Sequence, residues 1–147
     1  MSKIVILFGT ESGNAELAAE DMAEAFSGDR EVSVVDMTDF DIDDFSPEDF
    51  YIVISSTHGD GELPSSARPL FDALSATQSD LTGVNYAVFG LGDSSYDTYS
   101  RGSEIMDELF THLGAERVGV FGRHDASDGT LPNEGAVEWV RELHVFA

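Results

Sequence analysis

Three glycine-containing segments of the chain combine a permissive backbone with polar side chains that suit ligand binding. The first runs from Gly9 to Ala15 and carries the hydroxyls of Thr10 and Ser12 and the amide of Asn14. It lies between an apolar run and a helical pattern, so its N–H groups and the positive end of the helix dipole favour an anion. Because it lacks a lysine and the GxxxxGK(S/T) spacing, a single phosphate fits better than a nucleoside triphosphate with Mg²⁺. The alternative is a capped strand-to-helix turn with no ligand.

The second segment, from Ser56 to Pro64, places glycines around a single histidine. Gly59 can flip its peptide group at little steric cost, so it can present either a carbonyl oxygen or an N–H group to a ligand. The alternative is an acidic surface turn in which His58 is merely exposed.

The third segment, from Gly90 to Tyr99, again combines glycines, hydroxyls and aromatic rings. Tyr96 can lie flat on a planar heterocycle while backbone groups near Gly92 and Asp93 hydrogen-bond its edge. A capped helix entrance with Tyr96 packed on the core would use the same residues. A ligand is the better interpretation because all three segments are expected to converge on one crevice.

Composition limits the classes of partner and of chemistry. Among 147 residues, 29 are Asp or Glu and 7 are Lys or Arg, a formal net charge of −22 that disfavours nucleic acid and anionic membranes. We interpret this charge as adaptation to a high-salt cytoplasm, with a solvated, solubilising surface as the alternative. The chain has no cysteine, so disulfides and thiolate metal sites are excluded and redox chemistry would need a bound organic cofactor.

Five apolar runs rich in β-branched and aromatic residues predict the strands that position these segments. Most runs are continuous rather than alternating, which is typical of parallel strands covered by helices on both faces. The predicted strands are Lys3–Phe8, Val32–Asp36, Phe50–Ser56, Asn85–Gly90 and Arg117–Phe121. The first run starts too early for a signal peptide and none is long enough to span a bilayer, so we expect a cytoplasmic protein.

Helical periodicity between the strands predicts the helices that cover the sheet. The first helix is expected to bury Leu17, Ala18, Met22, Ala25 and Phe26. The helix after the fourth strand is expected to bury Ile105, Met106, Leu109, Phe110 and Leu113. Weaker patterns predict helices at Ala67–Leu74 and Asn133–Val145. The acidic connection Met37–Asp49 is predicted as a loop with one turn, held to the core by Phe40, Ile42 and Phe45.

This alternation predicts one α/β domain over residues 1–147, an open doubly wound parallel sheet of five strands with helices on both faces. Ligands of such sheets bind beyond the carboxyl ends of the strands. The three segments follow the first, third and fourth strands, so we expect them at the same edge, with the turn from His124 to Asp128 as a further candidate. His112, His124 and His144 are too scattered to suggest a metal site.

The same segments resemble a known family. Thr10-x-Ser12-Gly13-Asn14, Ser56–Gly61 and Phe89–Tyr96 are similar to the three FMN loops of short-chain flavodoxins and of the FMN domains of larger reductases, such as the sulfite reductase flavoprotein. The resemblance continues to the last helix around Trp139 and covers nearly the whole chain.

The resemblance implies a flavodoxin-like sheet of strand order 2-1-3-4-5 and one non-covalently bound FMN. It further implies a monomeric, low-potential electron carrier, not itself an enzyme, which shuttles electrons between a reductase and an electron-accepting enzyme that dock near the exposed flavin edge. FMN would cycle among oxidised, semiquinone and hydroquinone forms, with the Gly59–Asp60 peptide flipping toward flavin N5. The implied FMN contacts are Thr10, Glu11, Ser12, Gly13, Asn14, Ala15, Ser56, Thr57, His58, Gly59, Asp60, Gly61, Leu91, Gly92, Asp93, Tyr96, Tyr99 and Ser100.

Two residues depart from the family pattern. Ala15 stands where flavodoxins usually carry a hydroxyl residue, so one phosphate hydrogen bond worth about 1 kcal/mol is expected to be missing. His58 stands where the family usually places a Trp or Tyr that covers one face of the flavin ring, and an imidazole offers less area for stacking. Binding of FMN is expected to survive the change at Ala15, and the change at His58 is the more serious of the two.

Three other functions remain open. A stand-alone FMN domain that serves one specific reductase would carry the same loops. A cofactor-free regulatory module would need an acidic cluster after the first strand and an aspartate ending the third, where this chain has Gly9-Thr10 and Ser55-Ser56. A flavin or quinone reductase would need a nicotinamide fingerprint or an acid–base dyad beside the flavin, and the sequence offers neither.

Overall fold

The computed structural model describes residues 3–9, 14–25, 31–56, 66–78, 80–92, 101–118, 122–125 and 132–143. Its centre is a parallel sheet in the order β2-β1-β3-β4-β5, as the sequence predicts, with β6 also pairing with β4. The strands are β1 (Lys3–Gly9), β2 (Glu31–Asp36), β3 (Phe50–Ser56), β4 (Asn85–Gly92), β5 (Glu116–Arg117) and β6 (Gly122–Asp125).

Alternation along the central strands builds two separate cores, one on each face of the sheet. Ile4, Ile6 and Phe8 of β1 point to the first core with Phe50, Ile52 and Ile54 of β3. Val5 and Leu7 point to the second with Tyr51 and Val53. All of these side chains are buried, which explains why the strands appear as continuous apolar runs in the sequence.

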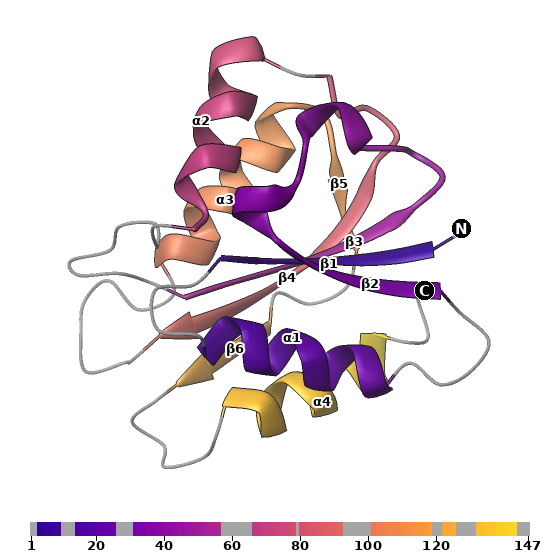
Figure 1. Cartoon of the computed structure of the whole chain (residues 1–147), viewed down its shortest axis with the longest axis vertical. Helices are drawn as coiled ribbons and strands as arrows, with labels where there is room; N and C mark the ends of the chain where they lie inside the picture. The colour runs from indigo at the N-terminus through magenta and orange to yellow at the C-terminus, as the bar shows by residue number, and fades with distance from the viewer. Residues whose placement is uncertain are drawn as a thin grey trace.

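Helices cover both faces, and Figure 1 shows α1 and α4 on one side of the sheet and α2 and α3 on the other. The helices are α1 (Asn14–Ala25), α2 (Arg68–Thr77), α3 (Arg101–His112) and α4 (Pro132–Leu143). Residues of α1 and α4 belong to the first core, and residues of α2 and α3 to the second. The predicted helices at Ala67–Leu74 and Asn133–Val145 are therefore confirmed, with ends shifted by a few residues. No helix in the described ranges has the length and apolar character needed to cross a membrane.

A glycine shortly after α3 explains why the helix ends there. Gly114 has φ of 101°, a left-handed conformation that glycine adopts without strain. The N–H of Ala115 donates to the carbonyl of Phe110 at 3.0 Å, and that of Gly114 to Thr111 at 3.1 Å. This Schellman pattern satisfies the last carbonyls of the helix and turns the chain into β5.

The fifth strand differs from its prediction. The run Arg117–Phe121 is not one strand within the described residues: β5 ends at Arg117, Val118 follows outside any strand, and β6 begins at Gly122. Glu116 pairs with Asn85, and Gly122 pairs with Phe89, so two short strands share the flank of β4. Gly122 is needed there because a Cβ would lie 2.6 Å from both Phe89 Cδ2 and Trp139 Cδ1.

The predicted buried face of α1 is wrong at Leu17, which is 60% exposed. Ala15, Ala18, Ala19 and Met22 are fully buried instead. Small residues on this face let α1 lie close to the sheet and to α4, which a bulkier side chain would prevent. Ala25 packs against the core as predicted, and Phe26 lies outside the described residues.

The acidic connection after β2 contains two short 3₁₀ turns, η1 (Met37–Asp39) and η2 (Ile42–Asp44), rather than one turn. Each turn is capped by an aspartate: the carboxylate of Asp36 accepts from the N–H of Thr38, and that of Asp41 from the N–H of Asp43, both at 2.9 Å. Phe40, Ile42 and Phe45 pack against the second core, as predicted.

Candidate functional site

The carboxyl ends of the central strands lie side by side and form the edge at which the predicted site belongs. Gly9 of β1 pairs with Ser55 of β3, and Ser55 pairs with Gly90 of β4. Gly92 in turn pairs with Asp125 of β6. The chain therefore leaves the sheet at four neighbouring points, before residues 10–13, 57–65, 93–100 and 126–131. The sequence predicts the first three of these segments as the ligand site. It also predicts the turn His124–Asp128 as a further candidate, but His124 and Asp125 belong to strand β6.

A close contact at Gly9 holds two of these segments together. A Cβ built on Gly9 would lie 2.8 Å from Cβ of Ala67, 3.2 Å from Met37 Sδ and 3.3 Å from Ser55 Oγ. Ala67 is the residue just before α2. The connection between β3 and α2 therefore ends in contact with Gly9, the last residue of β1. Thr38 adds a second tie, since its hydroxyl donates to the carbonyl of Ser66 at 3.0 Å.

The amino end of α1 lies where the sequence predicts an anion-binding segment. The helix begins at Asn14, five residues after Gly9, the last residue of β1, and its first turn contains Glu16 but no basic residue. Ala15 is fully buried and belongs to the first core. Because the methyl group of Ala15 packs into this core, a larger side chain at the second residue of α1 would not fit without rearrangement.

Most predicted site residues lie outside the described part of the chain, so their mutual geometry stays a prediction. These are Thr10, Glu11, Ser12, Gly13, Thr57, His58, Gly59, Asp60, Gly61, Asp93, Tyr96, Tyr99 and Ser100. Asn14, Ser56 and Gly92 are placed by their backbones at the ends of α1, β3 and β4. Ala15 and Leu91 are placed in full, and both are buried in the first core.

Residues that the sequence did not single out for the site also shape this edge. Ser55, for example, is completely buried beside Gly9. His124 and Asp125, which the sequence did propose for this edge, pair through their backbones with Leu91 and Gly92. Apolar contacts of Met37 and Ala67 with the end of β1 depend on tertiary packing, so no local sequence pattern could have revealed them. The glycine at position 9 was the available signal, and its close neighbours explain it.

Comparison with known proteins agrees with this architecture. The family model described as Flavodoxin matches residues 6–139. Flavodoxin YqcA from Escherichia coli (strain K12) is 33% identical over 97% of this chain and 96% of its own length. The crystal structure of oxidised Flavodoxin 2 from Bacillus cereus aligns with a TM-score of 0.81 at 29% identity, covering 99% of both chains.

Similarity also extends to one part of larger proteins. NADPH oxidoreductase A from Dictyostelium discoideum is 36% identical over 78% of this chain, yet the match spans only 18% of that protein. The chain therefore corresponds to a small portion of such a protein and to nearly the whole of Flavodoxin YqcA.

Proposed function

The chain belongs to the flavodoxin family, whose members carry electrons on FMN, and on this premise we propose that it is a low-potential carrier binding one FMN non-covalently. The observation that carries the proposal is the meeting of β1, β3 and α2 at Gly9. Gly9 lies against Ala67 and Ser55. The Gly9–Ala15 segment, which we expect to bind the phosphate, therefore starts next to the residues that flank the Ser56–Pro64 segment.

The described residues fit the group at the points where they can be compared with it. Helix α1 begins at Asn14, within the Gly9–Ala15 segment, so its amino-terminal N–H groups suit a phosphate without a basic side chain. The third segment leaves the sheet at Gly92, next to Ser56 across the β3–β4 pairing. A ring held between the second and third segments and a phosphate at the first is the arrangement that these anchors support.

The acidic character of the chain supports a low potential. We propose one domain that spans residues 1–147, with Asp60 and Asp93 in its flavin site. A negative charge about 10 Å from a reduced, anionic flavin costs about 1.7 kcal/mol at an effective dielectric constant of about 20. Such charges disfavour reduction, and salt weakens the effect. The proposed setting is a cytoplasm of high salt, in which a monomer exchanges electrons with a donor reductase and an acceptor enzyme.

A second candidate is a stand-alone FMN domain dedicated to one reductase. The similarity to a small part of NADPH oxidoreductase A favours it. In both cases this chain holds and positions the cofactor, and turnover belongs to the partner enzymes.

Titration of the flavin-free protein with FMN tests the proposal. We expect stoichiometric quenching of FMN fluorescence and visible flavin bands that change in two stages on anaerobic reduction. Riboflavin, which lacks the phosphate, is expected to bind about a hundredfold more weakly, because hydrogen bonds to a charged group contribute about 1.5–3 kcal/mol each. Equal affinities for both flavins would contradict the assignment of the phosphate segment, and no binding of either would refute the proposal.

A pair of serine variants localises the phosphate. Ser12→Ala is expected to weaken FMN about tenfold and to leave riboflavin unchanged, because only FMN presents a phosphate to this hydroxyl. Ser75→Ala is the matched control, since Ser75 lies in the last turn of α2, at the opposite end of the helix from the carboxyl edge. Its affinity for FMN is expected to equal that of the unmodified protein.

A further inference from the structure

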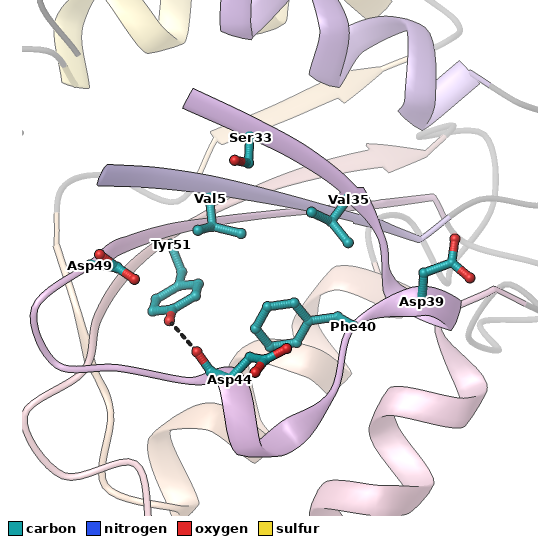
Figure 2. A pocket seen from close by; sticks show the side chains of 8 residues that line it. All are labelled: Val5, Ser33, Val35, Asp39, Phe40, Asp44, Asp49 and Tyr51. Atoms are coloured by element: carbon teal, nitrogen blue, oxygen red, sulfur yellow. Dashed lines mark hydrogen bonds between the residues drawn. The ribbon is translucent and has the colours of Figure 1, made fainter. Parts of the chain in front are cut away.

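A pocket of about 380 Å³ lies on the second face of the sheet, under the acidic connection after β2. Val5, Val35, Phe40 and Tyr51 supply its apolar and aromatic surfaces. Figure 2 shows the two valines extending from the strands toward the rings of Phe40 and Tyr51. These rings stand edge to face, with centroids 6.2 Å apart. The pocket is therefore walled by groups that can contact an apolar or flat substituent.

Three aspartates of the acidic connection after β2 line this pocket. Asp39 belongs to η1, Asp44 to η2, and Asp49 directly precedes β3. Asp39 and Asp44 are exposed, whereas Asp49 is buried. Neither of the arginines with described side chains, Arg68 and Arg117, is among the lining residues.

The hydroxyl of Tyr51 is buried in the wall of the pocket and lies near two of these aspartates. Burial raises the pKa of its hydroxyl, the hydrogen bond from the Ser46 N–H opposes that rise, and the charges of Asp49 and Asp44 add to it. The hydroxyl is fixed, because it accepts from the Ser46 N–H at 2.8 Å and donates to the Asp44 carbonyl at 3.3 Å. A positive group entering the pocket would meet the exposed carboxylates of Asp39 and Asp44.

The part of the pocket formed by Tyr51 lies away from the carboxyl edge, whereas Asp39 follows Met37 and Thr38 at that edge. Tyr51 lies five residues before Ser56 on β3, which corresponds to about 17 Å along an extended strand. Ser33 and Val35 come from β2, the outermost strand of the sheet, so the pocket reaches the β2 edge. An occupant could therefore remain in place while the carboxyl edge stays accessible.

We propose that this pocket anchors an arginine side chain presented by a basic partner protein. Its volume lies at the lower end of the roughly 300–1,000 Å³ typical of ligand pockets, which suits one side chain better than a large molecule. Charge complementarity between a chain of net charge −22 and a basic surface would bring the partner to this face. The anchor would hold the partner at a site distinct from the predicted flavin loops.

Arginine fits better than lysine for two reasons. Its planar guanidinium can stack on the ring of Phe40, which is partly exposed, and its several N–H donors can reach more than one carboxylate. Its aliphatic stem can contact the partly exposed Val35. A lysine ammonium offers a point charge without a flat face.

The probe is a capped Gly-Arg-Gly peptide, titrated into the FMN-loaded protein at one fixed salt concentration. Methyl resonances of Val5 and Val35 and the ring resonances of Tyr51 are followed by NMR. We expect saturable shifts confined to the pocket, with affinity reduced about threefold to fivefold for a neutral citrulline peptide, the size expected of an exposed ion pair. A lysine peptide is expected to bind more weakly than the arginine peptide. Equal binding of the arginine and citrulline peptides, or of the arginine and lysine peptides, would overturn the proposal.

Charge-neutralising variants separate a pocket from a general acidic attraction. Asp39→Asn and Asp44→Asn are each expected to weaken the arginine peptide about threefold. Asp43→Asn removes the same charge from the same 3₁₀ turn, but Asp43 is exposed and does not line the pocket. A threefold loss with Asp43→Asn as well would contradict the pocket and indicate surface attraction alone. This outcome is independent of the proposed function, because FMN binding is read separately from the flavin bands.

Discussion

The hydroxyl of Tyr86 donates to Oδ1 of Asp107 at 2.6 Å, a side-chain hydrogen bond that joins β4 to α3. The same hydroxyl lies 2.9 Å from Oγ1 of Thr111, and Asp107 uses its other oxygen to accept from Arg117 at 2.8 Å. Tyr86 is fully buried, so this network satisfies a polar group inside the second core. It also ties the short strand β5 to the helix through Arg117.

Tyr86→Phe is expected to lower the free energy of unfolding by about 1–2 kcal/mol, because the variant removes a buried hydroxyl and leaves Asp107 with one fewer partner. Urea unfolding monitored by circular dichroism measures the loss. Thr111→Ala is the matched control: Tyr86 keeps Asp107 as its partner, so the expected loss is smaller. Equal losses would show that the bond to Asp107 does not dominate the network.

Alkaline pH should destabilise the protein through its buried tyrosines. Burial, and then the hydrogen bond to Asp107, raise the pKa of Tyr86 well above its ordinary value of 10.0, while Thr111 and Arg117 oppose the rise. Above about pH 10 the folded protein keeps the proton of the Tyr86 hydroxyl, whereas the unfolded chain loses it. The contribution of protonated Tyr86 to the free energy of unfolding is therefore complete below that pH and is lost as the pH rises above it. Each such tyrosine contributes a slope of up to about 1.4 kcal/mol per pH unit. Tyr86→Phe is expected to flatten the decline between about pH 10 and 11 in unfolding curves.

Gly122→Ala is expected to destabilise the protein by about 1–3 kcal/mol, the usual range for overpacking a core. The added methyl group would meet Phe89 on β4 and the indole of Trp139 on α4 at distances that force one of them to move. Thermal unfolding measures the effect, and Trp139 fluorescence should shift as its ring is displaced. An unchanged melting temperature with unchanged fluorescence would contradict the packing at this strand.

Salt should stabilise α1, which presents Glu16, Glu20 and Glu24 at successive four-residue intervals on an exposed surface. Like charges at this spacing destabilise a helix by about 0.2–0.5 kcal/mol per pair. Glu20→Lys converts two repulsive pairs into attractive ones, so it is expected to raise stability in dilute buffer by about 1 kcal/mol. The gain should shrink in molar KCl because of screening. Glu20→Gln, which removes the charge alone, should give about half the gain. Equal stability of the unmodified protein in dilute buffer and in molar KCl would contradict the high-salt interpretation.

His58 provides a prediction for the proposed cofactor. With a reference pKa of about 6.5, a protonated imidazole beside the flavin would favour the reduced anion and raise the potential as pH falls. His58→Phe is expected to remove this part of the pH dependence while retaining a ring for stacking. Potentiometric titrations between about pH 5.5 and 8 measure it. An unchanged profile would show that His58 does not influence the flavin.

The central strands could be predicted because burial on both faces gives each of them an apolar run of residues. Phe50–Ser56 was predicted with both ends correct, and β1 and β4 differ from their predictions only by one or two residues at the carboxyl end. Two-sided burial makes such runs uniformly apolar, so no knowledge of their neighbours is needed. Their order and the edge they share also follow the resemblance to flavodoxins.

The errors have a common origin in contacts between distant segments. Leu17 is more hydrophobic than the alanines beside it, yet the close approach of α1 to the sheet selects Ala15 and Ala18 for the interior. The apolar run after Arg117 resembles a strand centre, but pairing with β4 uses Glu116 on one side and Gly122 on the other. Neither result is encoded within a short sequence window. For the site, the sequence predicted the edge, whereas the contact of Gly9 with Ala67 required the fold.

The aspartates of the connection after β2 serve local geometry as well as net charge. Asp36 and Asp41 each accept a backbone N–H two residues ahead, so the residues that make this segment acidic also shape its turns. An engineered form for dilute buffer could not replace them indiscriminately. Asparagine would preserve an acceptor oxygen at these two positions, whereas lysine would abolish it and remove this acceptor from the N–H groups of Thr38 and Asp43.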